Sequence, residues 1–286
     1  LSIMVFLDKI LFIIVTYKVK YYEANSYISL KESFLSSNSK YDEKLNIFIV
    51  DNTDIDGWDL SNCLEQDENI KVVYNKLNNP GLSYAYNRGA EFAKNNGFSW
   101  IVLLDQDTEL PLYFYAEYRK ASENDNNILI KAPIILINKE RILSPAKYIF
   151  FKSYLYKNLD VGITELKKNS FINTGMLINT DFFIKTGGYN EKIKLDFADH
   201  DFVYKCKKII SNFEVMDVKL IQDFSSETNS QDQAKKRYKL YLRDLKEFKK
   251  NKDNRFLLFL NADFFRLVKL TIQYKTIDFI KIRFSL

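Results

Sequence analysis

Short apolar runs alternate with amphipathic stretches through the first half of the chain. The apolar runs are rich in β-branched and aliphatic residues and predict buried strands at 11–16, 45–50, 70–74 and 100–104. The stretches between them predict helices at 22–35, 58–66 and 83–95. Ser83 is the expected cap of the last helix, after the turn Asn79-Pro80-Gly81. This alternation predicts a parallel sheet with helices on both faces.

The pattern changes after Pro111. A helix is expected at 112–123 and a long strand at 128–137, and a strand with a polar interruption is expected at 171–178. The last strand is expected at 215–221, and from Asp232 onward the apolar positions have a helical period.

Composition is that of an ordinary globular protein. The 286 residues, 47% hydrophobic and 28% charged, suffice for one large domain or one domain with an appendage. Cys63 and Cys206 lie far apart without metal-ligand spacing, so the sequence favours a reducing, cytoplasmic environment. The apolar stretch 3–17 carries Asp8 and Lys9, and we expect it to contain the first strand rather than a membrane span.

The net charge of +5 is unevenly distributed. Residues 235–286 contain fifteen Lys or Arg and five Asp or Glu, so this tail carries +10 and the remainder −5. Its basic and aromatic residues interleave, which suits anionic lipid headgroups. The alternative is a helical cap whose aromatic side chains pack on the body. No nucleic-acid partner is expected, because no recognised motif accompanies the charge.

The end of the strand at 100–104 is the most informative position. Asp105 and Asp107 follow it, one residue apart, at the edge where open α/β sheets bind ligands. Two carboxylates at this position could ligate a Mg²⁺ or Mn²⁺ ion that also binds a diphosphate. The alternative is a solvated acidic turn closed by Pro111.

Other strand ends also carry polar side chains. Thr16 and Tyr17 end the first strand, and Asp51 and Asn52 end the second. Carboxylates suit an imide nitrogen or a ribose hydroxyl, and a tyrosine ring stacks on a base. The chain has no Gly-x-Gly-x-x-Gly and no Walker-type lysine loop, which disfavours ordinary dinucleotide or P-loop binding.

A second acidic cluster contains Asp196, Asp199, Asp201 and the single histidine, His200. One of these acids is a candidate general base. The alternative is an acidic helix start that complements the helix dipole. His200 is a candidate metal ligand, although a lone histidine is more often structural.

Taken in order, these motifs resemble glycosyltransferase family 2, in its bacterial rhamnosyltransferase-like branch. The resemblance runs from about residue 10 to 245 and rests on the following segments. They are Ile14-Val15-Thr16-Tyr17, Val50-Asp51-Asn52, Asn79-Pro80-Gly81 with Asn87-Arg88-Gly89, Leu103-Leu104-Asp105-Gln106-Asp107-Thr108-Glu109-Leu110-Pro111, Asn173-Thr174-Gly175 with Gly187-Gly188-Tyr189-Asn190-Glu191, and Ala198-Asp199-His200-Asp201-Phe202.

The resemblance implies a GT-A fold, α/β with a mostly parallel Rossmann-like sheet and helices on both faces, in residues 1–228. A basic, aromatic-rich helical extension would follow in 229–286. The implied activity is inverting transfer of a sugar from dTDP-rhamnose or a UDP-hexose to a saccharide acceptor in bacterial O-antigen or capsule synthesis. The enzyme would be cytoplasmic, and at the inner face of the membrane if the extension contacts lipid and the acceptor is lipid-linked.

The resemblance also assigns roles. Asp199 would be the catalytic base, and Asp107, with Asp105, would hold Mg²⁺ or Mn²⁺. Contacts to the nucleotide sugar would come from Thr16, Tyr17, Asp51, Asn52, Asn79, Gly81, Asn87 and Asp105. Acceptor-side contacts would come from Asn173, Thr174, Gly175 and Asp201.

Two departures from the family pattern leave alternatives open. Ala198 replaces the glutamate that precedes the base, and Gln222-Asp223 replaces the histidine after the last strand. The third metal ligand would be Gln222, Asp223 or His200. A sugar-nucleotide-binding protein with impaired catalysis, or a glycoside hydrolase with two carboxylates, is the alternative function.

Overall fold

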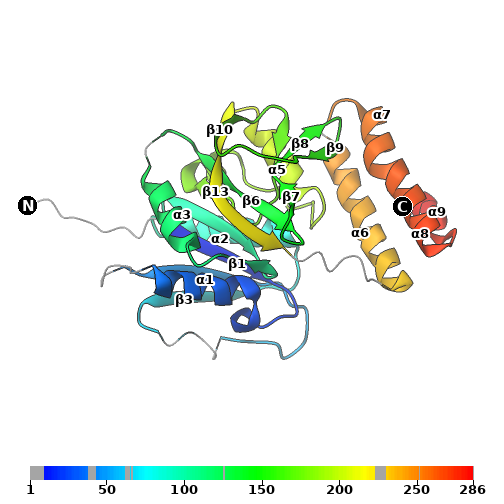
Figure 1. The fold of residues 1–286 in the computed structure, drawn as a ribbon. Helices are drawn as coiled ribbons and strands as arrows, with labels where there is room; N and C mark the ends of the chain where they lie inside the picture. Colours follow the sequence, from blue (N-terminus) through cyan, green and yellow to red (C-terminus); the bar gives the residue numbers. More distant parts are fainter. Residues whose placement is uncertain are drawn as a thin grey trace, which may run out of the picture.

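The computed structural model describes residues 10–37, 43–61, 65, 67–124, 126–222, 230–250 and 252–285. A mixed sheet runs through the centre of the molecule, in the order β10-β13-β6-β12-β4-β1-β2-β3, with β5 beside β13 and β7 beside β6 (Figure 1). Its strands are β1 (Ile10–Thr16), β2 (Leu45–Asp51), β3 (Ile70–Lys76), β4 (Trp100–Asp105), β5 (Thr108–Glu109), β6 (Ile130–Ile137), β7 (Arg141–Ser144), β10 (Gly162–Glu165), β12 (Leu177–Asn179) and β13 (Asn212–Gln222).

The sheet is mostly parallel at its centre. Strands β3, β2, β1 and β4 are parallel neighbours, and β6 is parallel to β13. β12 lies between β4 and β6 and is antiparallel to both. This arrangement confirms the α/β class that the alternating pattern predicted. A separate small sheet contains β11 (Asn169–Ser170), β8 (Ala146–Ile149) and β9 (Lys152–Leu155).

Strand β1 is buried along its whole length because helices cover both faces of the sheet. Its residues 11, 13 and 15 point into one core layer, and residues 10, 12 and 14 into the other. The helices of the first layer are α2 (Leu82–Asn95), α4 (Thr180–Lys185) and α5 (Ala198–Cys206). Those of the second are α1 (Asn25–Ser36), preceded by η1 (Tyr21–Glu23), and α3 (Phe114–Glu123).

Three local expectations were wrong. The stretch 58–66 is not helical in its described part, where the Trp58 indole instead donates to Asp51 Oδ2 at 2.8 Å. Helix α2 begins at Leu82 after Gly81, and the hydroxyl of Ser83 donates to the carbonyl of Ile193 rather than capping the helix. Of the run 171–178, the structure makes only the end a strand, because a turn at Gly175 (φ +79°) precedes β12.

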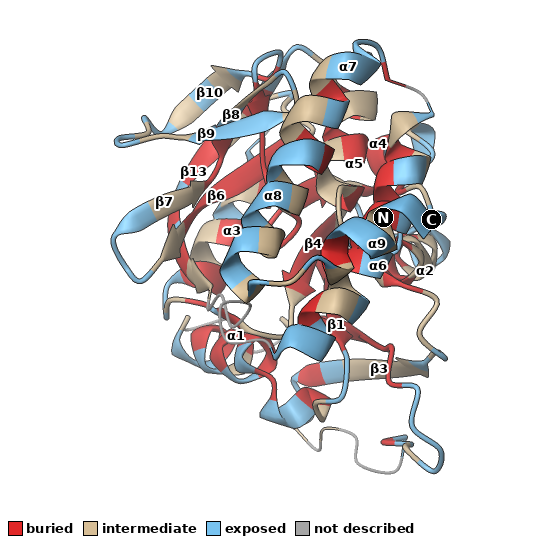
Figure 2. Ribbon diagram, turned by 90° about the vertical axis from the view of Figure 1, so that its right-hand side faces the viewer, coloured by how far each residue is buried: buried red, intermediate tan, exposed pale blue. Residues whose placement is uncertain are grey.

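The basic C-terminal residues form helices packed along one side of the molecule (Figure 1). They are α6 (Gln231–Lys249), α7 (Arg255–Leu258), the π-helix η3 (Phe259–Phe264), α8 (Phe265–Tyr274) and α9 (Asp278–Ser285). Tyr238, Leu245 and Phe248 of α6 join the same core cluster as the sheet, which supports the helical-cap interpretation. Figure 2 shows buried strands of the sheet behind the largely exposed α8 and α9. No described helix is long and apolar enough to cross a membrane.

Candidate active site

The ends of three parallel strands bring polar side chains together at one edge of the sheet. Thr16, the last residue of β1, lies opposite Asp51 of β2, and Val15 lies opposite Asp105 of β4. Neighbouring parallel strands end at the same edge, which is where open α/β sheets bind ligands. The sheet register therefore assembles groups that the sequence places about 35 and 54 residues apart.

Asp105 is held by helix α2 and by the turn before β12. The hydroxyl of Tyr86 donates to Asp105 Oδ1 at 2.6 Å, and the Asp105 backbone N–H donates to Thr174 Oγ1 at 3.2 Å. The pKa of Asp105 is raised to about 6, chiefly by burial and also by the charges of Asp107 and Asp199, while the hydrogen bond from Tyr86 opposes the rise. Asp199, from the second acidic motif, therefore lies within electrostatic range of Asp105.

Asp107 lies in the turn between β4 and β5. Because β5 pairs with β13, Thr108 lies opposite Gln222, the last residue of β13. Gln222 Nε2 donates to Asp107 Oδ1 at 3.4 Å, and the Gln222 side chain also lowers the pKa of Asp105. The pairing of β5 with β13 thus brings Gln222 to both carboxylates.

This group of side chains fits a divalent cation. Gln222 Oε1 is buried and has no hydrogen-bond partner among the described residues, an arrangement that is costly unless a ligand binds it. With the carboxylates of Asp105 and Asp107 it supplies the hard oxygen atoms that Mg²⁺ and Mn²⁺ prefer. Within the described ranges no three His, Cys, Asp or Glu side chains gather as metal ligands, so His200 does not complete such a site. Asp223 lies outside the described residues.

Asp51 is fully buried, and its carboxylate is used within the fold. Oδ1 accepts the backbone N–H of Thr53 at 2.9 Å, and Oδ2 accepts from Trp58 Nε1 and the Tyr74 hydroxyl, each at 2.8 Å. Asp51 therefore anchors the loop that follows β2, and its contact with a nucleotide stays a prediction.

Two neighbouring buried oxygen atoms have no hydrogen-bond partner in the described part of the chain. They are Thr16 Oγ1 and Asn52 Oδ1, and both residues are at least 95% buried. Asn52 Nδ2 donates to the carbonyl of Gly81 at 3.3 Å, which orients the amide. Because buried polar atoms in proteins are normally paired, these two oxygens are candidates for contacts with a ligand.

Gln106, between the two aspartates, links the ends of β1 and β4. Its Oε1 accepts the backbone N–H of Tyr17 at 2.7 Å. The ring of Tyr17 is 39% exposed and so is available for stacking.

The segment from Asn79 to Asn87 packs against the loop before α5. Asn79 (φ +45°) and Gly81 (φ +115°) both adopt positive φ values. A Cβ atom at Gly81 would lie 2.9 Å from the backbone of Lys194, so only glycine fits. Asn87 accepts the backbone N–H of Tyr189 at 2.9 Å and donates to its carbonyl at 3.0 Å. Its side chain thus joins α2 to the segment after α4.

The turn Asn173-Thr174-Gly175 packs directly against the end of β4. The N–H of Gly175 donates to the carbonyl of Leu103 at 2.7 Å, and Thr174 Oγ1 lies 2.7 Å from Thr108 Oγ1. Asn173 Oδ1 accepts from the Tyr189 hydroxyl at 2.7 Å. This turn, which the sequence assigned to the acceptor side, therefore helps to hold Asp105 in place.

Asp199 lies in the first turn of α5 and is half-buried. Its Oδ1 accepts the backbone N–H of His200 at 2.7 Å. The His200 ring stacks on Tyr148 at 4.0 Å between ring centroids, and its Nδ1 lies 2.8 Å from Ser170 Oγ. Burial lowers the pKa of His200, the charge of Asp199 opposes this and that of Lys207 adds to it. We therefore assign His200 a structural position beside Asp199.

Asp201 points to the C-terminal extension. Its Oδ1 pairs with Lys252 Nζ at 2.8 Å in a buried ion pair beneath the rings of Tyr204 and Phe248. This contact links α5 to the extension, and the acceptor-side role of Asp201 stays a prediction.

The extension also holds the loop that leads to Asp199. The buried carboxylate of Asp244 on α6 accepts the backbone N–H groups of Lys194, Leu195 and Asp196 at 2.8–2.9 Å. Arg237, also on α6, forms a bidentate ion pair with Asp196. Helix α6 therefore fixes the loop directly before α5.

Tyr86, Gln106 and Asp244 belong to this site but were not among the residues that the sequence indicated. Each acts on a group between 19 and 89 residues away, and Tyr86 and Asp244 belong to no local motif. The only available signal was the position of Gln106 between two aspartates and of Tyr86 directly before Asn87.

A mostly parallel α/β sheet with acidic residues at its strand ends and a further carboxylate nearby is typical of GT-A folds. The chain belongs to glycosyl transferase family 2, whose sequence model matches residues 12–187. This match confirms the family that the motifs predicted. No curated protein sequence matches it significantly.

Solved structures of S. aureus TarS share the fold. TarS 1–349 in complex with UDP-GlcNAc is 13% identical, with a TM-score of 0.56 over 97% of this chain and 73% of that chain. A second structure of TarS 1–349 is 13% identical, with a TM-score of 0.52 over 90% of this chain and 72% of that one. A longer TarS structure is 14% identical, with a TM-score of 0.52 over 87% of this chain. The present chain spans 41% of the length of that longer TarS. These likenesses confirm the GT-A fold.

Proposed function

We propose that the chain is an inverting glycosyltransferase that moves a sugar from a nucleoside diphosphate sugar to a hydroxyl group of a saccharide acceptor. The observation that carries this proposal is the gathering of Asp105, Asp107 and Gln222 at the strand ends, where Gln222 Nε2 donates to Asp107 Oδ1 at 3.4 Å. The charge of Asp199 contributes to the raised pKa of Asp105, which supports a further carboxylate nearby. The Asp105 and Asp107 pair would hold the cation at the diphosphate of the donor. The attacking hydroxyl of the acceptor needs a separate base. Carboxylates in both positions support a single displacement.

The donor side would be built from the strand ends. Thr16 Oγ1 and Asn52 Oδ1 would accept hydrogen bonds from the nucleotide, since both lack partners among the described residues. Asp105, Asp107 and Gln222 would hold Mg²⁺ or Mn²⁺. When bound, the cation would neutralise charge on the departing nucleoside diphosphate.

The acceptor side would depend on Asp199. The carboxylate would accept the proton of the attacking hydroxyl and would stabilise the positive charge that develops at the anomeric carbon. The N–H of His200 fixes one of its oxygen atoms and leaves the other for the acceptor. Asn173, Thr174 and Gly175 would shape this side of the site.

Asp199→Asn tests the role of the base. We expect kcat to fall by about 10² to 10⁴, because the amide cannot take the proton, while donor binding is retained. Asp217→Asn, the same change at an exposed residue of β13, is the matched control. Normal turnover by Asp199→Asn would remove Asp199 from this role.

The donor is either dTDP-rhamnose or a UDP-hexose. The presence of UDP-GlcNAc in a structural relative supports testing UDP-sugars alongside dTDP-rhamnose. A thermal-shift screen of nucleotide sugars, with and without Mg²⁺ or Mn²⁺, would identify the donor because a ligand that binds the native state stabilises it.

Assays of sugar transfer and glycoside cleavage, run beside this screen, separate the alternatives. Donor binding without transfer to any acceptor would favour a binding protein with impaired catalysis. Cleavage of a glycoside without nucleotide or metal would favour a hydrolase.

We also propose that the enzyme acts at the cytoplasmic face of a bacterial membrane, on a lipid-linked acceptor for surface polysaccharide. This is supported by exposed phenylalanine side chains on the extension, among them Phe256, Phe265 and Phe284. Assay with a membrane-extracted acceptor, compared with soluble saccharides, tests this placement.

A further inference from the structure

A cavity in the C-terminal extension is lined mainly by basic side chains. It has a volume of about 600 Å³ and lies among α6, α7, η3 and α9. Asp263 is its acidic lining residue, and the basic ones are Arg243, Lys246, Lys249, Lys250, Arg255 and Arg283. The proposed sugar-transfer chemistry uses none of these residues.

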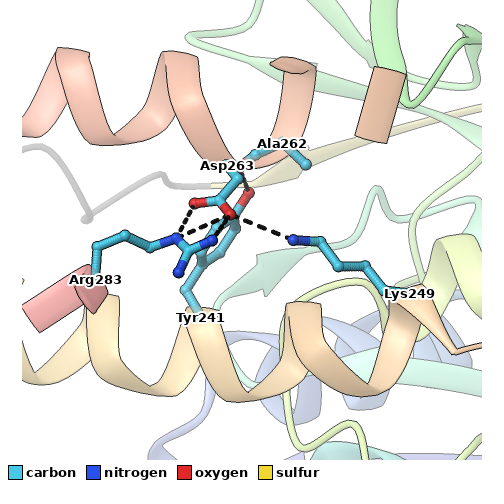
Figure 3. Close-up of polar contacts among 5 residues, drawn as sticks. All are labelled: Tyr241, Lys249, Ala262, Asp263 and Arg283. Carbon is cyan, nitrogen blue, oxygen red and sulfur yellow. Dashed lines mark hydrogen bonds and ion pairs between the residues drawn. The ribbon is translucent and has the colours of Figure 1, made fainter. Parts of the chain in front are cut away.

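Two of the cations share the single negative charge of Asp263 in the wall of the cavity. Asp263 is 1% exposed, and the guanidinium of Arg283 donates to both of its carboxylate oxygens at 2.7–2.9 Å. Lys249 Nζ lies 3.3 Å from Oδ2 on the other side, so that the two cations approach Asp263 from opposite directions (Figure 3). The negative charge of Asp263 is therefore already paired and does not balance the charges of the remaining lining cations.

Of the other four basic lining side chains, only that of Lys250 forms an ion pair with a described residue. Arg243, Lys246 and Lys250 share one face of α6 because they are three and four residues apart, and Arg255 joins them from α7. Lys250 pairs with Glu247 at 2.7 Å. Arg243, Lys246 and Arg255 are exposed and form no ion pair with any residue that the structure describes. Like charges so placed repel each other, and a bound anion would relieve the repulsion.

The chemistry of the lining favours phosphate. Arginine binds a phosphate group in a bidentate way, and lysine adds a point charge. The cavity is also large enough for a headgroup rather than a single small ion.

Exposed phenylalanine residues next to the lining residues in the sequence favour a lipid as the source of the phosphate. Phe256, Phe264 and Phe284 directly follow the lining residues Arg255, Asp263 and Arg283 in the sequence and are 73%, 43% and 82% exposed. Exposed aromatic side chains beside cations are typical of surfaces that lie at the membrane interface. We propose that this cavity binds the phosphate-bearing headgroup of an anionic lipid, which adds a defined site to the membrane contact suggested above.

The test is cosedimentation of the full chain with vesicles, in the absence of sugar donor and acceptor. One set of vesicles is pure phosphatidylcholine, and the other contains equal parts of phosphatidylcholine and phosphatidylglycerol. The cavity variant is Arg243→Gln/Lys246→Gln/Arg255→Gln. The matched control is Lys236→Gln/Lys239→Gln/Lys269→Gln, which removes three exposed cations from α6 and α8 outside the cavity lining.

We expect the wild type to bind the anionic vesicles and not the neutral ones. The cavity variant should bind about a hundredfold more weakly, and the control variant within about threefold of the wild type. Equal loss in both variants would mean diffuse charge rather than a site and would overturn the proposal. Failure of the wild type to bind would overturn it as well. Retained glycosyl transfer by the cavity variant on a soluble acceptor keeps this outcome separate from the proposed enzyme function.

Binding of free inorganic phosphate is the second test of the proposal. Calorimetric binding of phosphate to the wild type, lost in the cavity variant and unaccompanied by vesicle binding, would overturn the lipid assignment. Displacement of the protein from anionic vesicles by high phosphate, together with vesicle binding that depends on the cavity, would support it.

Discussion

The hydroxyl of Tyr86, on helix α2, donates a 2.6 Å hydrogen bond to Oδ1 of Asp105, at the end of β4. This contact stabilises the ionised carboxylate inside a buried setting that otherwise favours its protonated form. Helix α2 therefore helps to set the charge of Asp105 in the proposed donor site, although Tyr86 belongs to none of the motifs at the strand ends.

Tyr86→Phe should shift the acidic limb of the kcat/KM profile to higher pH. The pKa of Asp105 is about 6 with the hydrogen bond present, and loss of the bond should raise it by up to about one unit. Activity should therefore fall near pH 6 and approach the wild-type value above pH 8. Tyr84→Phe, two residues earlier on α2, is the control and should leave the profile unchanged. An acidic limb that does not shift in Tyr86→Phe would contradict the role assigned to Tyr86.

Asp105→Asn should stabilise the ligand-free protein at pH 8 while reducing sugar transfer. The folded-state pKa of about 6 lies above the ordinary value of 3.8, so the folded protein holds this proton more tightly. Stability from this group is present below pH 4 and is lost as the pH rises from about 4 to 6, by about 3 kcal/mol in all. Urea denaturation should show Asp105→Asn as the more stable protein at pH 8, with a smaller difference at pH 5.

The pH dependence distinguishes this effect from a general one. Asp217→Asn, which removes an exposed charge, should give the same difference from the wild type at both pH values. A wild type as stable as Asp105→Asn at pH 8 would show that the buried charge is not costly.

Gln222 substitutions should change cation affinity in opposite directions. Gln222→Glu adds a third carboxylate and should tighten Mn²⁺ binding about tenfold, whereas Gln222→Met removes the amide oxygen and should weaken it about tenfold. Thermal shift against MnCl₂ without nucleotide measures this directly. Gln273→Glu, on an exposed position of α8, is the control. Equal affinities in all variants would exclude Gln222 as a ligand.

Asp244→Ala should destabilise the protein by about 3 kcal/mol. The change leaves three backbone N–H groups of the loop 194–196 without their acceptor, and each unmet buried donor is costly. Because that loop leads to Asp199, kcat should fall more than donor affinity. Asp232→Ala, at an exposed position in the first turn of α6, should cost less than about 1 kcal/mol. Urea denaturation and donor titration check both parts.

The sequence located the acidic residues at the strand ends because the information for them is local. Asp51 and Asp105 each end an apolar run, and the period of such runs predicts a parallel sheet whose strand ends share one edge. The order of the motifs was enough to identify the family, and the sequence model over 12–187 confirms it.

The expected helix at 58–66 failed for a long-range reason. Trp58 is drawn to the buried carboxylate of Asp51, and this contact competes with the local preference for a helix. The turn at Gly175 similarly replaced part of an expected strand, because its N–H bonds to Leu103 in β4.

The extension shows the limit of pattern analysis most clearly. Its aromatic residues have one helical period in the sequence, yet Tyr238 and Phe248 are buried in the main core while Phe256 and Phe284 are exposed. Only the docking of α6 on the catalytic body separates these two groups.

The sequence by itself determined the parallel strands β1 to β4, the acidic residues at the ends of β2 and β4, the family and the basic character of the C-terminal residues. The tertiary structure alone decided that Gln222 meets Asp107, that Tyr86 bonds to Asp105 and that Asp244 holds the loop before Asp199. The physical reason is that residue periodicity encodes which face of an element is buried. The partner that a polar group finds depends on how elements distant in sequence pack together, and no local pattern contains that information.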